Sequence, residues 1–168
     1  IEGVMGVTIA YVTRMGEGPF PTELLDETGE ALRDKGGEYG TTTNRPRRCG
    51  WLDLVVLRYA IRVNGLTEIC LTKLDVLDGQ ESVKICTNYV YNNEKVEHFP
   101  LDLDVFNECE PEYVELPGWD EDISKITDFE KLPENAKTFV DYIEQAVGVK
   151  VSMVSVGPHR VQTIFKND

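Results

Sequence analysis

The sequence lacks any apolar stretch of the roughly 18 residues that a membrane-spanning helix needs. We therefore expect no membrane partner. Its four cysteines, Cys49, Cys70, Cys86 and Cys109, also lack the paired C-x-x-C spacing of a zinc site. Cys70 and Cys86 stand inside apolar runs, where a free thiol behaves as a small core side chain. This usage predicts reduced thiols and a cytoplasmic location.

Positive charge is scarce, because 17 Lys and Arg stand against 30 Asp and Glu, a net charge of −13. Binding to a nucleic-acid polymer depends on Lys and Arg that neutralise phosphates, so this class of partner is disfavoured. The acid excess is local: residues 94–135 contain 14 Asp or Glu and 3 Lys, a net charge of −11. Since Pro111, Pro117 and Gly118 are scattered through this region, we expect mostly irregular surface structure over residues 100–131.

Histidine, a common metal ligand and partner of a catalytic nucleophile, is also scarce. The two histidines, His98 and His159, have no Cys, His or carboxylate partner at metal-ligand spacing, and no Ser or Cys nucleophile motif is evident. We assign no catalytic residue and no metal ligand within this sequence. Its first residue is Ile1 rather than Met, with no basic-then-apolar signal segment, and we interpret the chain as part of a longer polypeptide.

The composition is that of a globular domain, 41% hydrophobic and 28% charged over 168 residues. Apolar runs and period-two alternation predict strands at several places. They cover residues 4–14, residues 68–72, residues 83–91 paired with residues 96–99 as a hairpin, and residues 149–155. A turn at residues 92–95 would join the two strands of the hairpin.

Two helices are predicted to pack on a core, and residues 22–35 have a mixed helical character. The first helix covers residues 51–64 and ends before Gly65. Its apolar face is formed by Leu52, Val55, Val56, Tyr59 and Val63. The second has Pro133 in its first turn and ends at Gly148. We therefore predict one mixed α/β domain over residues 1–168, in which strands end in ligand loops.

Polar residues directly follow the buried strand predicted at residues 68–72, in the place where α/β sheets bind ligands. A carboxylate fixed at Asp75 can accept both the ring N–H and the exocyclic amine of guanine, whereas adenine has an acceptor in place of that ring donor. The aliphatic stem of Lys73 can lie across the purine face. A solvated Lys and Asp at a strand end is the common alternative for so short a segment, Thr72-Lys-Leu-Asp75.

A second segment, Ser155-Val156-Gly157-Pro158, follows the last predicted strand. Gly157 would let the backbone approach a ligand closely, and backbone N–H groups there could bind a purine carbonyl. An ordinary exit from strand to loop is the alternative. The segment becomes a candidate ligand site when it is considered together with Asp75.

A third segment, residues 40–48, combines threonines with arginines in an otherwise acidic chain. Arg45 precedes Pro46 and is pushed toward extended geometry, which would project Arg45 and Arg47 to one side. Their guanidinium groups suit a carboxylate or a phosphate. An anion-binding loop and a basic solvated turn are both open interpretations.

Taken together, these segments resemble the C-terminal part of the adenylosuccinate synthetase family. The resemblance covers essentially all 168 residues and is carried by the runs AYVTRMGEGPFPTEL, GTTTNRPRRCGWLD, LTKLDVLDG, LPGW and VSVGPHR. It implies a GTP-dependent ligase of purine biosynthesis that joins IMP to L-aspartate, giving adenylosuccinate, GDP and phosphate. In the family, GTP phosphorylates the 6-oxygen of IMP and the aspartate amine displaces that phosphate, with Mg²⁺ organising the polyphosphate. The family is typically a homodimer.

The resemblance also implies roles for particular residues. GTP binding falls to Arg47, Lys73, Leu74, Asp75, Ser155, Val156 and Gly157. Binding of aspartate or IMP falls to Met15, Thr41, Thr42, Thr43, Asn44, Arg45, Pro46 and Arg47. Asn44 stands where the family usually has glycine, and asparagine tolerates positive φ better than most residues. Pro46 stands where a basic residue is common.

The family's glycine-rich phosphate loop, with the catalytic Asp and His that activate IMP and hold Mg²⁺, has no counterpart in these residues. We therefore expect the chain to be the C-terminal segment of a larger P-loop-like ligase, inactive alone, with Mg²⁺ bound elsewhere. A noncatalytic guanine-nucleotide-binding module is the main alternative, and an acidic interaction domain using residues 94–135 is another. The threonine–arginine loop favours the ligase, because a protein that only binds GTP does not need an aspartate clamp.

Overall fold

The computed structural model describes residues 2–166, which divide into two units. The first takes in the chain up to Ala10, Leu57–Val83 and the residues from Glu115 onward. The second takes in Tyr11–Val56 and Lys84–Val114. Within residues 2–166, no helix is both long and apolar enough to cross a membrane.

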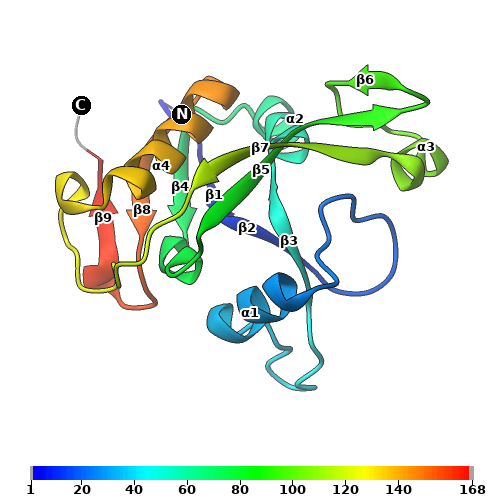
Figure 1. Cartoon of the computed structure of the whole chain (residues 1–168). Helices are drawn as coiled ribbons and strands as arrows, with labels where there is room; N and C mark the ends of the chain where they lie inside the picture. The colour runs from blue at the N-terminus through cyan, green and yellow to red at the C-terminus, as the bar shows by residue number, and fades with distance from the viewer. Residues whose placement is uncertain (1, 167–168) are drawn as a thin grey trace. The chain divides into compact units, whose positions relative to one another are not determined.

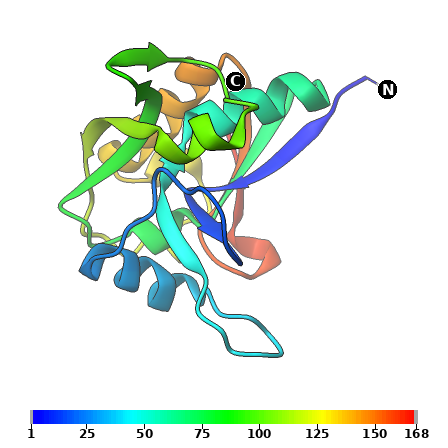
Figure 2. The same cartoon turned by 90° about the vertical axis from the view of Figure 1, so that its right-hand side faces the viewer.

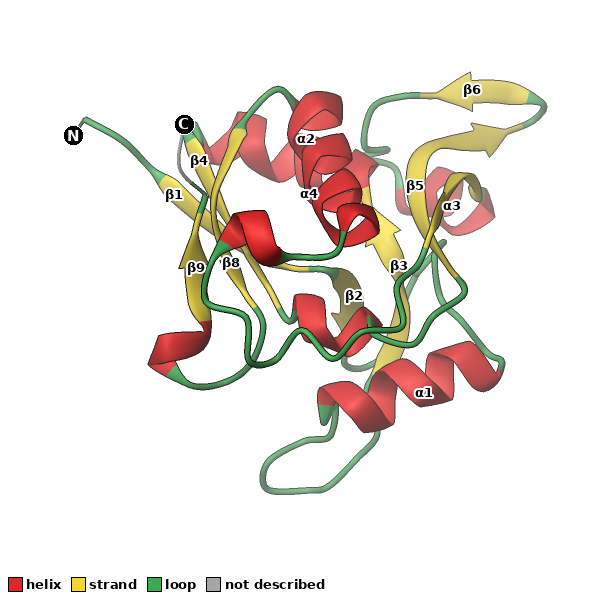
Figure 3. Cartoon of the chain, turned by 60° about the vertical axis from the view of Figure 1, so that its left-hand side comes forward, coloured by secondary structure: helices red, strands yellow, loops and turns green. Residues whose placement is uncertain are grey.

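The first unit contains a four-stranded sheet, whose strands lie side by side in Figure 3. Its order is β1 (Met5–Ile9), β4 (Glu68–Thr72), β8 (Lys150–Ser155) and β9 (Thr163–Phe165). The first three strands are parallel, and β9 runs antiparallel to β8. The parallel arrangement brings the carboxyl ends of β4 and β8 to the same edge of the sheet.

Helix α4 (Glu134–Val147) runs alongside β8 in Figure 1. Its buried residues are Ala136, Phe139, Val140 and Ile143, at the spacing of one helix face. Pro133 is the N-cap, and Gly148 ends the helix in a left-handed conformation with φ 69°. The predicted second helix is therefore confirmed.

The second sheet is built around β5 (Ser82–Tyr91). Strand β3 (Arg48–Asp53) pairs parallel with β5 and antiparallel with β2 (Tyr11–Arg14). The hairpin is confirmed, but its return strand β6 covers Glu94–Val96 instead of residues 96–99. Asn92 and Asn93 both adopt positive φ, 50° and 63°, as a two-residue type I′ turn requires.

Helix α2 spans Leu54–Asn64, so the prediction of a helix from residue 51 is wrong at its start. Buried Asp53 determines where the helix begins, because its Oδ1 accepts hydrogen bonds from the N–H groups of Val55 at 2.9 Å and Val56 at 3.2 Å. The predicted apolar face is also partly wrong. Val56 is 38% exposed and Val63 is 61% exposed.

The single strand expected over residues 4–14 is two strands, β1 and β2, in different sheets. The chain bends at Ala10, which is buried and donates its N–H to the carbonyl oxygen of Thr72 at 2.9 Å. The sequence does not indicate this bend, because the residues on both sides of Ala10 favour strands.

The expectation of mostly irregular structure over residues 100–131 is wrong. The region contains helix α3 (Leu103–Glu108), strand β7 (Glu110–Pro117), which pairs with β5, and the 3₁₀ turn η2 (Phe129–Lys131). Asp102 caps α3 by accepting the N–H groups of Asp104 and Val105. Helix α1 (Glu27–Gly36) overlaps the segment of residues 22–35 in which the sequence showed a mixed helical character, whereas α3 was not predicted, so residues 2–166 hold four α-helices.

All four cysteines are free and buried, which confirms the prediction of reduced thiols. Cys86 and Cys109 belong to a buried cluster with Tyr89 and Phe106. Burial raises the pKa of the Cys70 and Cys109 thiols, so these groups remain protonated over a wider pH range than an exposed cysteine.

Candidate functional site

The two segments predicted to recognise guanine lie next to each other. Lys73 directly follows β4, and Ser155 is the last residue of β8, its parallel neighbour. The N–H of Lys73 donates to the Oγ of Ser155 at 3.3 Å. The first residues of the two predicted segments, Lys73 and Ser155, are therefore in contact.

Lys73 adopts a left-handed conformation, with φ 60° and ψ 35°. A non-glycine residue persists there only when its surroundings hold it, and such positions cluster at ligand sites. The holding contacts are present: Leu74 is fully buried, and the Lys73 carbonyl accepts the N–H of Val76 at 3.2 Å. Asp75 lies in the first turn of the 3₁₀ helix η1 (Leu74–Leu77), with its Oδ1 buried.

The second segment, residues 155–157, makes contacts within the protein that the sequence did not predict. Val156 is buried, and its N–H donates to the carbonyl oxygen of Gln162 at 2.9 Å, so this amide is not available to a purine carbonyl. Within residues 2–166, no hydrogen bond involves the N–H of Gly157. A Cβ on Gly157 would lie 2.3 Å from side-chain atoms of Gln162. The glycine therefore makes room for Gln162, a residue that the sequence motif did not single out.

The loop of residues 40–46 is tied together at its base and exposed at its tip. Tyr39 forms an antiparallel bridge with Pro46, and Gly40 donates its N–H to the Arg45 carbonyl at 2.9 Å. Asn44 has φ 50°, in agreement with the expectation that asparagine can replace glycine there. Exposed side chains belong to Thr41, Thr42, Thr43, Asn44, Arg45 and Pro46. Figure 2 shows the loop extending away from α1 and β3.

Arg45 and Arg47 lie in different environments, although the sequence predicted two similar anion-binding groups. Arg45 is exposed, whereas the Arg47 side chain is 32% exposed and its Nη1 lies 2.9 Å from Oε2 of Glu38. Glu38 is 1% exposed and also accepts the hydroxyl of Tyr11 at 2.6 Å. The carbonyl oxygen of Arg47 accepts a hydrogen bond from Nε of Arg33 at 2.8 Å. Arg47 is thus oriented by a buried carboxylate, and Arg45 is the exposed cation of the loop.

Met15 is 60% exposed and lies in the loop that follows β2. Arg48 organises this loop: its Nη1 donates to the carbonyl oxygens of Gly16 at 3.1 Å and Gly18 at 2.9 Å. The same guanidinium makes two hydrogen bonds to Glu23, which raise the pKa of Arg48. The sequence did not single out Arg48, because its partners lie more than 20 positions away along the chain.

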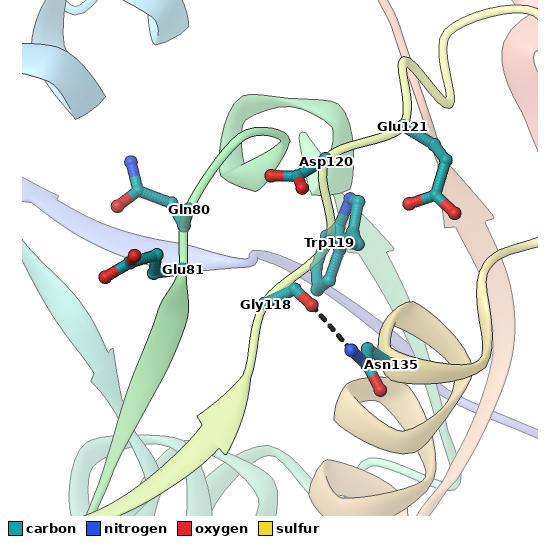
Figure 4. A pocket seen from close by; sticks show the side chains of 7 residues that line it. All are labelled: Gln80, Glu81, Gly118, Trp119, Asp120, Glu121 and Asn135. Carbon is teal, nitrogen blue, oxygen red and sulfur yellow. Dashed lines mark hydrogen bonds between the residues drawn. The ribbon is translucent and has the colours of Figure 1, made fainter.

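A pocket of about 290 Å³ lies in the first unit, and none of the predicted site residues lines it (Figure 4). It is lined by Gln80, Glu81, Gly118, Trp119, Asp120, Glu121 and Asn135. The side-chain amide of Asn135 donates to the Gly118 carbonyl at 2.6 Å. Three carboxylates and no cation line the pocket, which makes it unfavourable for a phosphate group.

Within the described residues, no group of three or more His, Cys, Asp or Glu side chains is arranged to hold a metal ion. The candidate site combines the carboxylate of Asp75 with hydrogen-bonding and cationic groups.

These features define the class as a mixed α/β protein with polar loops at the carboxyl ends of neighbouring parallel strands. The family model described as adenylosuccinate synthetase matches residues 1–164, and the chain belongs to that family. The family inferred from the sequence motifs is thereby confirmed.

Relatives and a solved structure agree with this assignment. The chain is 58% identical over 167 residues to adenylosuccinate synthetase of Syntrophomonas wolfei and 57% identical over 164 residues to that of Caldanaerobacter subterraneus. These alignments cover 99% and 98% of the chain but only 39% and 38% of the relatives, so the chain spans about two fifths of their length. The structure of fully ligated adenylosuccinate synthetase from Plasmodium falciparum matches with a TM-score of 0.96 and 44% identity, over 99% of this chain and 40% of that one.

Proposed function

We propose that these residues form part of a ligase that joins IMP and L-aspartate to give adenylosuccinate, at the cost of GTP. The observation that carries the proposal is the fold match, at a TM-score of 0.96, to a protein named adenylosuccinate synthetase. The chain supplies guanine recognition and the aspartate-binding loop. GDP and phosphate are the other products.

Guanine recognition is assigned to the adjacent segments after β4 and β8. The Asp75 carboxylate accepts the ring N–H and the 2-amine of guanine, and the Gly157 N–H donates to the 6-carbonyl. The stem of Lys73 covers the purine face. Hydrogen bonds to a charged group contribute about 1.5–3 kcal/mol each, so the loss of both Asp75 contacts would discriminate strongly against other purines.

Substrate binding is assigned to the exposed loop and to Met15. The planar guanidinium of Arg45 pairs with a carboxylate of L-aspartate, and the hydroxyls of Thr41, Thr42 and Thr43 supply smaller donors. Arg47, held by Glu38, lies toward the nucleotide phosphates in this assignment. The backbone of Met15 contacts IMP.

Magnesium binding and phosphoryl transfer are assigned to other parts of the protein, because the family's glycine-rich phosphate loop and its catalytic Asp and His have no counterpart in these residues. When bound, Mg²⁺ would neutralise charge on the polyphosphate. The proposal also includes a homodimer and a cytoplasmic location.

The test is product formation by the full-length protein with IMP, L-aspartate, GTP and Mg²⁺. The proposal expects adenylosuccinate, GDP and phosphate in equal amounts, and no product when GTP is replaced by ATP. Tight binding of GDP without any product would instead support the noncatalytic guanine-nucleotide-binding module.

A further inference from the structure

Gln162 makes hydrogen bonds to Ser124, Val156 and His159, around the proposed guanine-binding segment. Its Nε2 donates to the carbonyl oxygen of Ser124 at 2.8 Å, and its Oε1 accepts the N–H of His159 at 2.9 Å. Its carbonyl accepts the N–H of Val156, and its own N–H donates to the His159 carbonyl, both at 2.9 Å. Gln162 therefore closes the loop that leads from β8 to β9 and attaches it to the segment after β7.

The side chain of Gln162 also packs directly on Gly157. Since an added Cβ at Gly157 would come within 2.3 Å of the side-chain amide, the two residues are in close contact. Along the chain, the N–H of Gly157 lies between Val156 and His159. The N–H of Val156 donates a hydrogen bond to the carbonyl oxygen of Gln162, and the N–H of His159 donates one to Oε1 of Gln162. The position of this N–H thus depends on Gln162 from both sides.

We propose that Gln162 is a positioning residue for purine recognition, holding the Gly157 N–H where it meets the 6-carbonyl of guanine. The inference rests on the proposed function, because it takes residues 155–157 as a guanine contact. Gln162 itself touches no ligand in this account. Its effect on specificity is distinct from that of Asp75, which addresses the ring N–H and the 2-amine.

This division of roles gives a test with two nucleotide analogues in the full-length protein. 6-Thioguanosine triphosphate keeps the groups that Asp75 binds but replaces the 6-carbonyl with a weaker acceptor. Inosine triphosphate keeps the 6-carbonyl but lacks the 2-amine. A misplaced Gly157 N–H should therefore reduce the preference for GTP over the thio analogue and leave the preference for GTP over inosine triphosphate unchanged.

Two variants separate the effect of losing the side-chain hydrogen bonds of Gln162 from the effect of adding a charge. Gln162→Glu keeps the shape but cannot donate to the Ser124 carbonyl, and Gln162→Met removes both side-chain hydrogen bonds without adding charge. We expect each to raise the KM for GTP about tenfold, as the loss of one good hydrogen bond does, with kcat and the KM for L-aspartate nearly unchanged. The same substitutions at Gln145, an exposed residue of α4, are the matched controls and should have no effect.

The outcomes distinguish this inference from the function on which it rests. Wild-type protein that fails to bind GTP would overturn both together. Wild-type protein that binds GTP, with variants whose preference for GTP over the thio analogue equals that of the wild type, would overturn the positioning role alone. Equal losses of preference against both analogues would also contradict it, because Asp75 would then be disturbed as much as Gly157.

Discussion

Asp75 carries the choice of purine in the proposed site, since its carboxylate can accept two donors that only guanine presents together. We predict that Asp75→Asn in the full-length protein weakens the binding of GTP and shifts the nucleotide preference toward xanthosine triphosphate. The asparagine amide would donate to the 2-oxygen of xanthine, where the carboxylate accepted the 2-amine of guanine. The measurement is kcat/KM for both nucleotides.

Asp120→Asn serves as the control for this change, because Asp120 is an exposed carboxylate outside the proposed contacts. An unchanged preference for GTP over xanthosine triphosphate in Asp75→Asn would show that Asp75 is not the base-reading residue.

Arg45 is the exposed cation of the loop of residues 40–46, and its assigned partner is a carboxylate of L-aspartate. We predict that Arg45→Leu raises the KM for L-aspartate by about tenfold or more and changes the KM for GTP much less. Arg45→Lys should restore only part of the loss, since an ammonium lacks the planar bidentate geometry. Steady-state kinetics with each substrate varied in turn provides the measurement.

Arg62→Leu, at an exposed position of α2, is the matched control and should leave both KM values unchanged. Equal damage to GTP and aspartate binding in Arg45→Leu would count against the separate roles assigned to the loop and to the guanine-binding segments.

At the scale of elements, the base of the loop of residues 40–46 depends on a buried carboxylate. Glu38 accepts the Tyr11 hydroxyl and pairs with Arg47. We predict that Glu38→Gln lowers the free energy of unfolding by about 1–2 kcal/mol, since the half-buried Arg47 guanidinium loses its charged partner but still reaches water. It should also raise the KM for L-aspartate, because the loop loses its anchor.

Urea denaturation and steady-state kinetics together test this prediction. Tyr11→Phe should have a smaller effect, because it removes one hydrogen bond and keeps the ion pair, and Glu30→Gln on the exposed side of α1 should have little effect. A Glu38→Gln variant with wild-type stability and an unchanged KM for L-aspartate would contradict the anchoring role.

Elements with a local pattern could be predicted from the sequence. Strand β4 has the bounds expected from its short apolar run, and the Asn92-Asn93 turn marked the hairpin. Helix α4 followed from its apolar face and Gly148. In each case the neighbouring residues alone favour one conformation.

Elements that depend on distant contacts were missed. Strand β7 is recognisable only through its pairing with β5, because Pro111 and the acidic residues around it resemble a solvated loop. The start of α2 depends on the capping side chain of Asp53, within a segment whose apolar spacing fits a longer helix. Tertiary pairing and capping decided these boundaries.

At the scale of the whole molecule, the candidate site shows the same contrast. The adjacency of Lys73 and Ser155 follows from parallel strands, so it could be expected from the two strand ends. Gln162 and Glu38 could not be identified in advance, since their contacts depend on how the loops fold back. Family resemblance pointed to the residues to which ligand contacts are assigned and left out the residues that orient them.

The central claim is that residues 1–168 bind guanine and aspartate for a reaction whose phosphoryl-transfer groups lie elsewhere in the protein. Its most direct test is to assay adenylosuccinate formation from IMP, L-aspartate, GTP and Mg²⁺ with the full-length protein and with residues 1–168 alone. The account predicts turnover by the full-length protein and none by residues 1–168, because phosphoryl transfer needs a phosphate cradle and a metal ligand. Turnover by the 168-residue chain, or its absence from the full-length protein, would contradict the account.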